Sequence, residues 1–226
     1  MQLKLRVRGF SLVELMVAMV AGLILVAAVI TLFASILKAN STAMKVSRLN
    51  QELQSVTDMI ARDIQRAGYD ASAAAHTLVS GASSPFYFDS TQHLLNKYSS
   101  SPDKFRCIAL KYDERDENAA PSPGQPGAKE AVVYSYRSTS TDSSIWLNDL
   151  SASASLATLT AACGNGGERV STDGVIEITD LSFTLLLSSR VSGSRAIQLN
   201  ISGRYKDNTE LRLDLQRDIK LRNNGY

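Results

Sequence analysis

Glu14 is the residue of this chain whose type and position could do chemistry, because it lies near the start of an otherwise apolar run. From Leu15 to Leu37 only Thr31 and Ser35 are polar, so the run is long enough to cross a bilayer as a helix. A charge inside such a segment costs on the order of 2.5–3.5 kcal/mol on insertion scales. Lipid supplies no partner for the carboxylate, so we expect Glu14 to meet a positive group on another protein.

The residues around Glu14 resemble the class III signal of type IV prepilins and type II secretion pseudopilins. The sequence there reads Arg8-Gly9-Phe10-Ser11-Leu12-Val13-Glu14-Leu15-Met16, behind a short basic leader. The resemblance implies that a prepilin peptidase cuts between Gly9 and Phe10 and methylates the new amino terminus on Phe10. It also implies that Glu14, the fifth residue of the mature chain, acts in assembly. The alternatives are an ordinary signal anchor that contains a glutamate and a Sec-type signal cleaved near Ala27-Ala28.

Three basic residues, Lys4, Arg6 and Arg8, precede the apolar run. Positive residues beside a span tend to stay in the cytoplasm, so we expect the rest of the chain outside it. Residues 10–37 as a helix would measure ~42 Å at ~1.5 Å per residue, against ~30 Å of hydrocarbon, so the helix should tilt or emerge from the membrane. The whole chain has 24 basic and 22 acidic residues. Without the leader it is therefore close to neutral, and net charge gives no argument for nucleic-acid binding.

Cys107 and Cys163 are the two cysteines of the chain, and both fall in the part expected outside the cytoplasm. In an oxidising compartment they could form an intramolecular disulfide, and the alternative is a pair of buried free thiols. We favour the disulfide, which typically contributes ~2–4 kcal/mol.

A second helical pattern follows the apolar run, with no proline from Phe10 to Gly68. Apolar residues recur at spacings of three and four and form one stripe. These residues are Val46, Leu49, Leu53, Val56, Ile60 and Ile64. On the polar side Asp58 and Arg62 are spaced as a favourable ion pair, and Gly68 predicts the end of the helix. The sequence thus predicts one long helix, apolar all round at first and amphipathic afterwards.

Beyond the helix the sequence predicts β-strands divided by polar loops. Phe105–Tyr112 and Ala131–Tyr136 are compact runs with β-branched and aromatic residues. From residue 176 to residue 221 apolar and polar residues alternate, apart from a bulge near Thr179-Asp180 and a turn at Asp207-Asn208, which predicts an antiparallel sheet with one buried face. The Ser-, Thr- and Ala-rich stretch from Ser138 to Asp173 is interpreted as loops with a small satellite cluster.

The predicted organisation is an α+β fold with the helical stripe packed on an antiparallel sheet. Residues 1–9 form the leader, 10–37 the transmembrane helix, 38–69 its amphipathic continuation and 70–226 a β-rich periplasmic domain. In the family that the leader resembles, this arrangement is the pilin fold.

The sequence offers no catalytic site. Its two histidines, His76 and His93, lie in polar stretches, and no HExxH, GxSxG, P-loop or CxxC motif is present. The acidic stretch 113–117 could hold a cation, as some pseudopilins bind calcium, but it lacks EF-hand spacing and is interpreted as a solvated loop. We therefore expect a protein that is not an enzyme and has no cofactor and no metal.

The sequence at the end of the long helix resembles one group within this family. Ile60-Ala61-Arg62-Asp63-Ile64-Gln65-Arg66-Ala67-Gly68-Tyr69 is similar to the helix end of PilW-like minor pilins and of the related type II secretion pseudopilin J group, and Leu221-Arg222-Asn223 is similar to the endings of PilW-like chains. The resemblance implies a non-catalytic minor pilin that helps to prime type IV pilus assembly and sits at the pilus tip. It would be a single-pass protein of the inner membrane with a periplasmic domain before it joins the pilus at the cell surface. Its partners would be the prepilin peptidase, the other minor pilins, the major pilin and the inner-membrane assembly platform.

Other functions stay open at this point. They are a minor pseudopilin of a type II secretion system, a surface adhesin that binds through the loops of 138–173, and a membrane-anchored periplasmic enzyme. The stretch from Arg190 to Arg222 has an excess of basic residues. Arg204, Arg212 and Lys220 fall on the solvent-exposed face of predicted strands, where charged residues are common. We therefore do not expect DNA contact.

Overall fold

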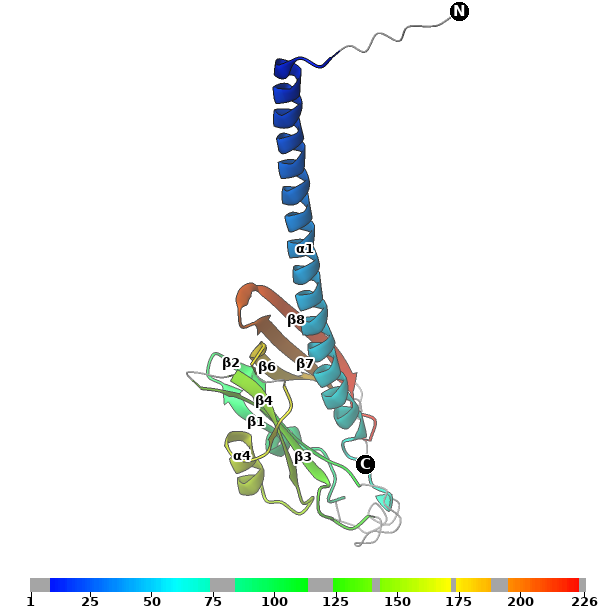
Figure 1. The fold of residues 1–226 in the computed structure, drawn as a ribbon. Coiled ribbons are helices and arrows are strands. Elements are labelled where there is room, and N and C mark those ends of the chain that lie inside the picture. Colours follow the sequence, from blue (N-terminus) through cyan, green and yellow to red (C-terminus); the bar gives the residue numbers. More distant parts are fainter. Residues whose placement is uncertain are drawn as a thin grey trace, which may run out of the picture. The chain divides into compact units, whose positions relative to one another are not determined.

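The computed structural model describes residues 9–73, 84–113, 124–139, 143–171, 174–187 and 195–223 (Figure 1). The helices are α1 (Leu12–Arg66), α3 (Ser90–His93) and α4 (Leu156–Gly164). The strands are β1 (Leu94–Tyr98), β2 (Ser101–Lys111), β3 (Ala131–Ser138), β4 (Ser143–Leu150), β5 (Glu168–Arg169), β6 (Ile176–Leu187), β7 (Arg195–Tyr205) and β8 (Asn208–Lys220). The chain divides into two units, residues 1–47 and 48–226. The basic leader residues, His76, Arg190 and most of the acidic stretch 113–117 lie outside the described residues.

Helix α1 is 55 residues long because its sequence contains no proline and little that competes for its backbone hydrogen bonds. It ends at Arg66, and Gly68 follows with φ of 79°, a left-handed conformation that favours glycine. The N–H of Gly68 donates to the carbonyl of Lys111 at 2.8 Å. A Cβ at this position would lie 2.7 Å from the carbonyl oxygen of Asn223, so the space is closed to any other residue. The predicted end of the helix is confirmed.

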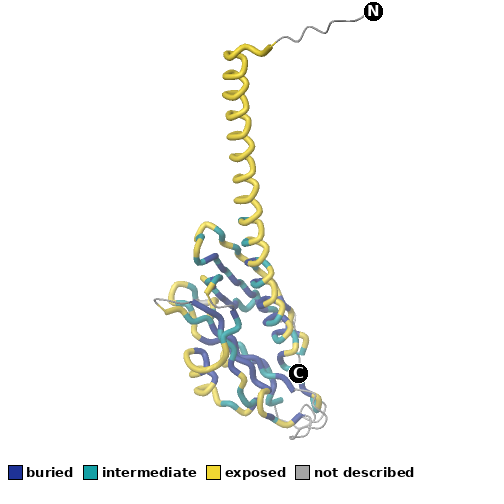
Figure 2. The backbone as a smooth tube through the Cα atoms, viewed as in Figure 1, coloured by how far each residue is buried: buried dark blue, intermediate teal, exposed yellow. Residues whose placement is uncertain are grey.

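The first unit consists of α1 up to Ser47, and its side chains are exposed almost throughout (Figure 2). The segment 12–37 is apolar on every side of the helix, so no orientation of it hides this surface from water. It is long and apolar enough to cross a membrane.

The second unit is built on one antiparallel sheet with the strand order β5-β4-β3-β2-β6-β7-β8, and β1 pairs with β2 outside this order. Cys107 of β2 is paired with Leu95 of β1 and with Ser135 of β3, whereas Phe105 is paired with Lys97 of β1 and with Phe183 of β6. β3 and β6 therefore share one edge of β2, and β1 occupies the other edge. The sheet divides at β2 into two leaves, β3-β4-β5 and β6-β7-β8, and curls.

The helical stripe packs on this sheet as predicted. Leu49, Leu53, Val56, Ile60 and Ile64 are buried in a core cluster with residues of β2, β3, β4, β6, β7 and β8. Only Val46, which is 44 % exposed, falls outside the core. The α+β pilin-like fold is confirmed.

Both faces of strands β2 and β3 are buried, which explains why their sequences are continuous apolar runs. Ile108 and Leu110 of β2 face the α1 core, whereas Cys107 and Ala109 face a second cluster that includes Leu159 of α4. A strand covered on both faces loses the alternation that marks a half-exposed strand.

The bulge predicted near Thr179-Asp180 is present, since the register of β6 against β7 shifts between Ile178 and Asp180. Tyrosines from two other strands hold it: the hydroxyl of Tyr136 donates to the carbonyl of Thr179 at 3.0 Å, and that of Tyr98 donates to the carboxylate of Asp180. The nearby turn lies at Lys206-Asp207, one residue earlier than predicted.

The interpretation of residues 138–173 as loops is wrong. This stretch contains the whole of β4, in which Ile145 belongs to the main core, and helix α4, which includes Cys163 and Gly164. The helix was hidden because its sequence is rich in alanine and threonine and carries no charged residue, so it lacks an amphipathic pattern. Strand β1 was also missed.

Candidate functional site

The N-terminal site begins with two residues that precede the first turn of α1. Phe10 is 83 % exposed, and a Cβ placed on Gly9 would meet no heavy atom of the described residues within 4 Å. The bond between them is therefore unprotected by the part of the chain that the structure describes. A protease active site needs such an accessible segment.

Glu14 lies in the first turn of α1, two residues after the helix begins. The carbonyl of Ser11 accepts from the N–H groups of Glu14 and Leu15, at 3.1 and 3.2 Å. A carboxylate in the first turn interacts favourably with the positive end of the helix dipole. Ser11 and Glu14 also have the S-x-x-E spacing that is typical of a capping box.

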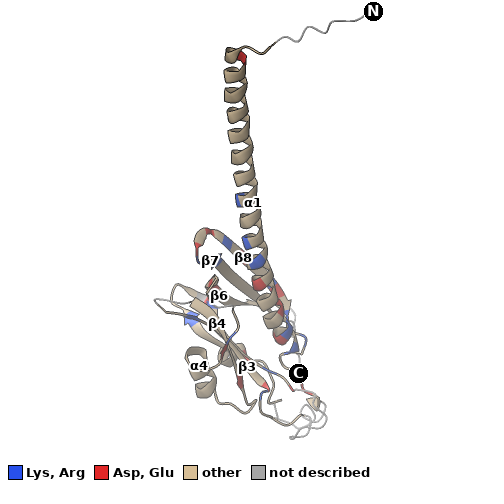
Figure 3. Ribbon diagram, viewed as in Figure 1, with Lys and Arg blue, Asp and Glu red and all other residues tan. Residues whose placement is uncertain are grey.

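The side chain of Glu14 is exposed, and it has no ion-pair partner among the residues the structure describes. Lys38 is the next charged residue along α1, nearly seven turns of helix further on, so the helix itself cannot neutralise the carboxylate. Figure 3 shows this uncharged length of α1 after a single acidic position. The arrangement presents one carboxylate at the end of an apolar cylinder.

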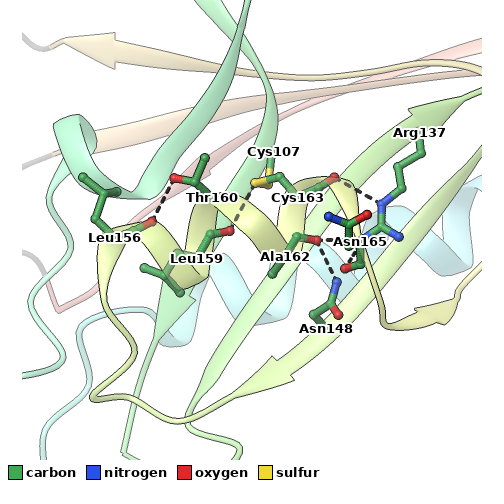
Figure 4. Close-up of a disulfide and its surroundings, with 9 residues drawn as sticks. All are labelled: Cys107, Arg137, Asn148, Leu156, Leu159, Thr160, Ala162, Cys163 and Asn165. Atoms are coloured by element: carbon green, nitrogen blue, oxygen red, sulfur yellow. Dashed lines mark hydrogen bonds between the residues drawn. A yellow bond between two sulfur atoms is a disulfide. The ribbon is translucent and has the colours of Figure 1, made fainter.

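The two cysteines lie in the second unit, whereas Gly9, Phe10 and Glu14 belong to the first. Cys107 on β2 and Cys163 at the end of α4 form a disulfide, with their Cα atoms 5.8 Å apart (Figure 4). Both are buried in the second cluster, where Ala109, Ala131 and Ala162 leave room for α4 to approach the sheet closely.

Arg137 of β3 holds the same end of α4 through the backbone. Its guanidinium donates to the carbonyls of Ala162 at 2.7 Å, Cys163 at 3.1 Å, Asn165 at 3.0 Å and Gly166 at 2.7 Å. A cation at this position satisfies carbonyls that have no partner within the helix, and it interacts favourably with the negative end of the dipole. Figure 4 shows the disulfide and the guanidinium of Arg137 at the same end of α4. The disulfide closes a helix end that the fold also fixes by hydrogen bonds.

Two polar contacts attach the second half of α1 to the sheet. The hydroxyl of Tyr134 donates to the carboxylate of Asp63 at 2.6 Å, and Arg217 of β8 pairs with the carboxylate of Asp58. The ion pair expected between Asp58 and Arg62 is therefore wrong, because the Asp58 carboxylate turns to β8 and Arg62 donates only to the Asp58 carbonyl, at 3.3 Å. A long-range partner replaced the local one.

Asp113, which was considered for a cation site, and His93, which was considered for a catalytic site, both have structural roles. The Asp113 carboxylate accepts from the backbone N–H groups of Ala71 at 3.0 Å and Gly124 at 2.7 Å, and so joins two loops. The Nδ1 atom of His93 accepts from the N–H of Asp89 at 2.9 Å, and burial lowers the pKa of His93 to about 4. Across the described residues no three His, Cys, Asp or Glu side chains form a group that could hold a metal ion.

The chain matches two family models. Residues 4–30 match the prokaryotic N-terminal methylation motif, and residues 42–221, more than half of the chain, match prepilin peptidase-dependent protein B. No curated protein and no solved structure matches the chain. The two family descriptions fit a structural, membrane-anchored, pilin-like protein that depends on a prepilin peptidase, not a known enzyme. The chain, in which the amphipathic part of α1 packs on a curled antiparallel sheet, therefore belongs to the prepilin peptidase-dependent protein B family of type IV pilin-like proteins.

Proposed function

We propose that this protein is a minor pilin that primes assembly of a type IV pilus and stays at or near its tip. The observation that carries the proposal is the exposed apolar segment of α1 with Glu14 as its one charge. A helix that served only as an anchor would be more stable in lipid without a carboxylate. The carboxylate therefore has a use in some other state of the protein.

That state is a bundle of like helices. We propose that a prepilin peptidase cuts between Gly9 and Phe10 and methylates Phe10, which places a positive amine at the end of the mature helix. As the helix leaves the lipid and enters the bundle, the amine of a neighbouring subunit neutralises Glu14. Such a pair chiefly sets register and partner choice, and removing one side of a buried pair typically costs ~3–5 kcal/mol.

The rest of the proposal follows from this mechanism. The protein waits in the inner membrane with residues 10–37 across the bilayer and residues 70–226 in the periplasm, where the Cys107–Cys163 disulfide is stable. The assembly platform, the other minor pilins and the major pilin are the partners that extraction from the membrane requires. The chain itself performs no catalytic step in this mechanism, because packing against like helices and one ion pair hold it in the bundle.

The test compares Glu14→Ala and Glu14→Gln with the unaltered protein in the cells that make the pilus. We expect all three proteins to be processed and inserted alike, and the amount of this subunit in sheared pili to fall sharply for Glu14→Ala. Glu14→Gln should be intermediate, because it keeps the capacity for hydrogen bonds but loses the charge. Pilus number is counted in the same cells.

Mass spectrometry of the mature N-terminus checks the processing step. A methylated Phe10 is expected, and Gly9→Val should leave an uncleaved precursor in the membrane. A mature chain that begins at Met1 or after Ala28 would contradict the processing proposal. If Glu14→Ala enters pili as the unaltered protein does, the carboxylate has no part in assembly. Co-purification with a secretion system and not with pilins would favour a minor pseudopilin.

A further inference from the structure

A groove of about 400 Å³ lies on the second unit, beside the last turns of α1. It is lined by Met59, Arg62, Asp63, Gln65, Arg66 and Arg222, and we call it the arginine groove. Three of its six residues are arginines and one is an acid, so these six residues have an excess of two positive charges, as large as the net charge of +2 of the whole chain.

The sequence of α1 places these side chains together. Arg62 and Asp63 lie three and four residues after Met59, and Arg66 lies four and three residues after them, so the four share one face of the helix. Ile60 and Ile64, on another face, are fully buried in the core and fix the rotation of the helix. Arg222, just beyond β8, completes the groove from the other end of the chain.

None of the three arginines has a carboxylate within ion-pair distance in the part of the chain that the structure describes. The arginines of β7 and β8 differ, since Arg204 pairs with Glu177, Arg212 with Asp214 and Arg217 with Asp58. The last of these pairs engages Asp58, the acid four residues before Arg62 in the helix. Arg62 is left with one hydrogen bond, from its Nε atom to a backbone carbonyl.

The remaining charges of the groove do not cancel this excess. Arg66 stacks over the ring of Tyr112, with the guanidinium carbon 4.2 Å from the ring centre, a contact that holds its plane and leaves its charge in place. Asp63 is the one acid of the lining, and its carboxylate already accepts the hydroxyl of Tyr134. Burial raises the pKa of Asp63 above its usual value, although the hydrogen bond from Tyr134 and the charges of Arg66 and Arg62 act in the opposite direction. One acid against three arginines still leaves the groove positive.

We propose that the arginine groove binds an acidic peptide segment of a neighbouring pilin subunit. Guanidinium groups match carboxylates as planar, two-pronged donors, and three of them around one groove favour a segment with more than one Asp or Glu. The inference rests on the proposed function, because only assembly brings such a neighbour to this surface.

Nucleic acid fits the groove less well. Non-specific nucleic-acid sites combine a basic track along several phosphates with exposed aromatic side chains on which bases stack. This groove is short, its lining contains no aromatic residue, and Tyr112 beneath Arg66 is only 7 % exposed.

The binding test uses the full chain in detergent and a fluorescent hexaglutamate peptide, with hexaglutamine as the uncharged control. Hexaglutamate should bind at low ionic strength and weaken as salt is added. Replacing Arg62, Arg66 or Arg222 by Gln should weaken binding by about 2–5-fold each, as expected for exposed ion pairs, and the triple variant should lose it. Arg62→Lys and Arg66→Lys should bind hexaglutamate with intermediate affinity, since lysine keeps the positive charge but lacks the planar pair of N–H donors of arginine.

Arg212→Gln is the matched control, because Arg212 is also exposed on the second unit but lies outside the groove and has its own acid. Unchanged hexaglutamate binding by the triple variant would overturn the proposal, and so would an equal loss for Arg212→Gln. Binding of a single-stranded oligonucleotide but not of hexaglutamate would overturn it in favour of a nucleic-acid site.

A second readout is made in cells. The triple variant should be processed and membrane-inserted normally, yet reach sheared pili in smaller amounts than Arg212→Gln does. The two proposals can fail separately. Peptide binding is measured in the absence of pili, whereas the Glu14→Ala variant changes pilus entry and leaves the residues of the arginine groove unaltered. Wild-type protein that binds hexaglutamate but never enters pili would overturn the proposed function, and with it the identity of the partner.

Discussion

The hydroxyl of Tyr134 on β3 donates a hydrogen bond of 2.6 Å to the carboxylate of Asp63 on α1, and the two residues are 71 positions apart in the chain. Tyr134 is 1 % exposed and Asp63 is partly exposed, so this polar contact lies at the edge of the core between helix and sheet. Burial raises the pKa of both groups, and the hydrogen bond from Tyr134 acts in the opposite direction on Asp63. The contact ties the helix to the sheet in the rotation that the buried Ile60 and Ile64 impose, with Asp63 in the lining of the arginine groove.

Tyr134→Phe should therefore destabilise the second unit. The variant leaves the Asp63 carboxylate partly buried without its donor, which costs about 1–3 kcal/mol. The pKa of Asp63 is raised in the folded state, so protonation favours folding, and the cost of the substitution should shrink as the pH falls toward 4. Urea unfolding at pH 7 and at pH 4 measures both effects. A double-mutant cycle with Asp63→Asn should show coupling, and additive effects would contradict the role given to this contact.

His93 should make the protein less stable in acid. Burial lowers the pKa of His93 from 6.5 to about 4, with Lys111 acting in the same direction and Asp89 opposing it. A lowered folded-state pKa gives stability that is present above the unfolded pKa of 6.5 and is lost as the pH falls toward 4. His93→Asn keeps an acceptor near the Nδ1 position and does not titrate, so it should flatten this dependence. The free energy of unfolding of the wild type and of His93→Asn, measured between pH 7 and pH 4, tests this prediction. The contribution of Asp63 to the pH dependence is the same in both proteins and cancels in the difference.

Removing the disulfide should be costly. The bridge closes a loop of 56 residues, for which the chain-entropy estimate is about 4 kcal/mol. Cys107→Ala with Cys163→Ala should lower the free energy of unfolding by roughly that amount, and the reduced wild type should behave like the variant. Thr160→Ala, on the exposed side of α4, is the control. If non-reducing peptide mapping showed two free thiols in exported protein, the bridge would not form there.

Gly203 of β7 should tolerate no larger residue, since an added Cβ would lie 3.0 Å from a methyl group of Leu53. Leu53 is fully buried and has little room to move, so Gly203→Ala should cost about 1–3 kcal/mol. Leu53→Val shortens the facing side chain, and the double variant should be less destabilised than the sum of the two single ones. Additive effects in thermal unfolding would show that the two residues do not compete for the same space.

The features that the sequence predicted well depend on neighbours along the chain. The stripe of α1, its end at Gly68 and the bulge near Thr179 each leave a local signature, because helix and strand periodicity place nearby residues on a common face. The prediction of loops around Trp146 was wrong because the structure there depends on residues that are distant in the chain. β4 is a strand because of its pairing with β3, and α4 is held by a disulfide, a serine cap and Arg137, of which only the cap is local.

By itself the sequence determined the N-terminal motif, the apolar helix that contains Glu14, the amphipathic continuation and the α+β class, since each follows from residue order and spacing. Only the tertiary structure decided which charges find partners. Asp58 could have paired with Arg62 four residues away, yet it pairs with Arg217 at a separation of 159 residues, because the packing of Leu53 and Ile60 on the sheet brings β8 alongside α1. The weak local ion pair, worth only a few tenths of a kcal/mol, gives way to the arrangement that the apolar core imposes. Arg62, Arg66 and Arg222 meet around one groove for the same reason.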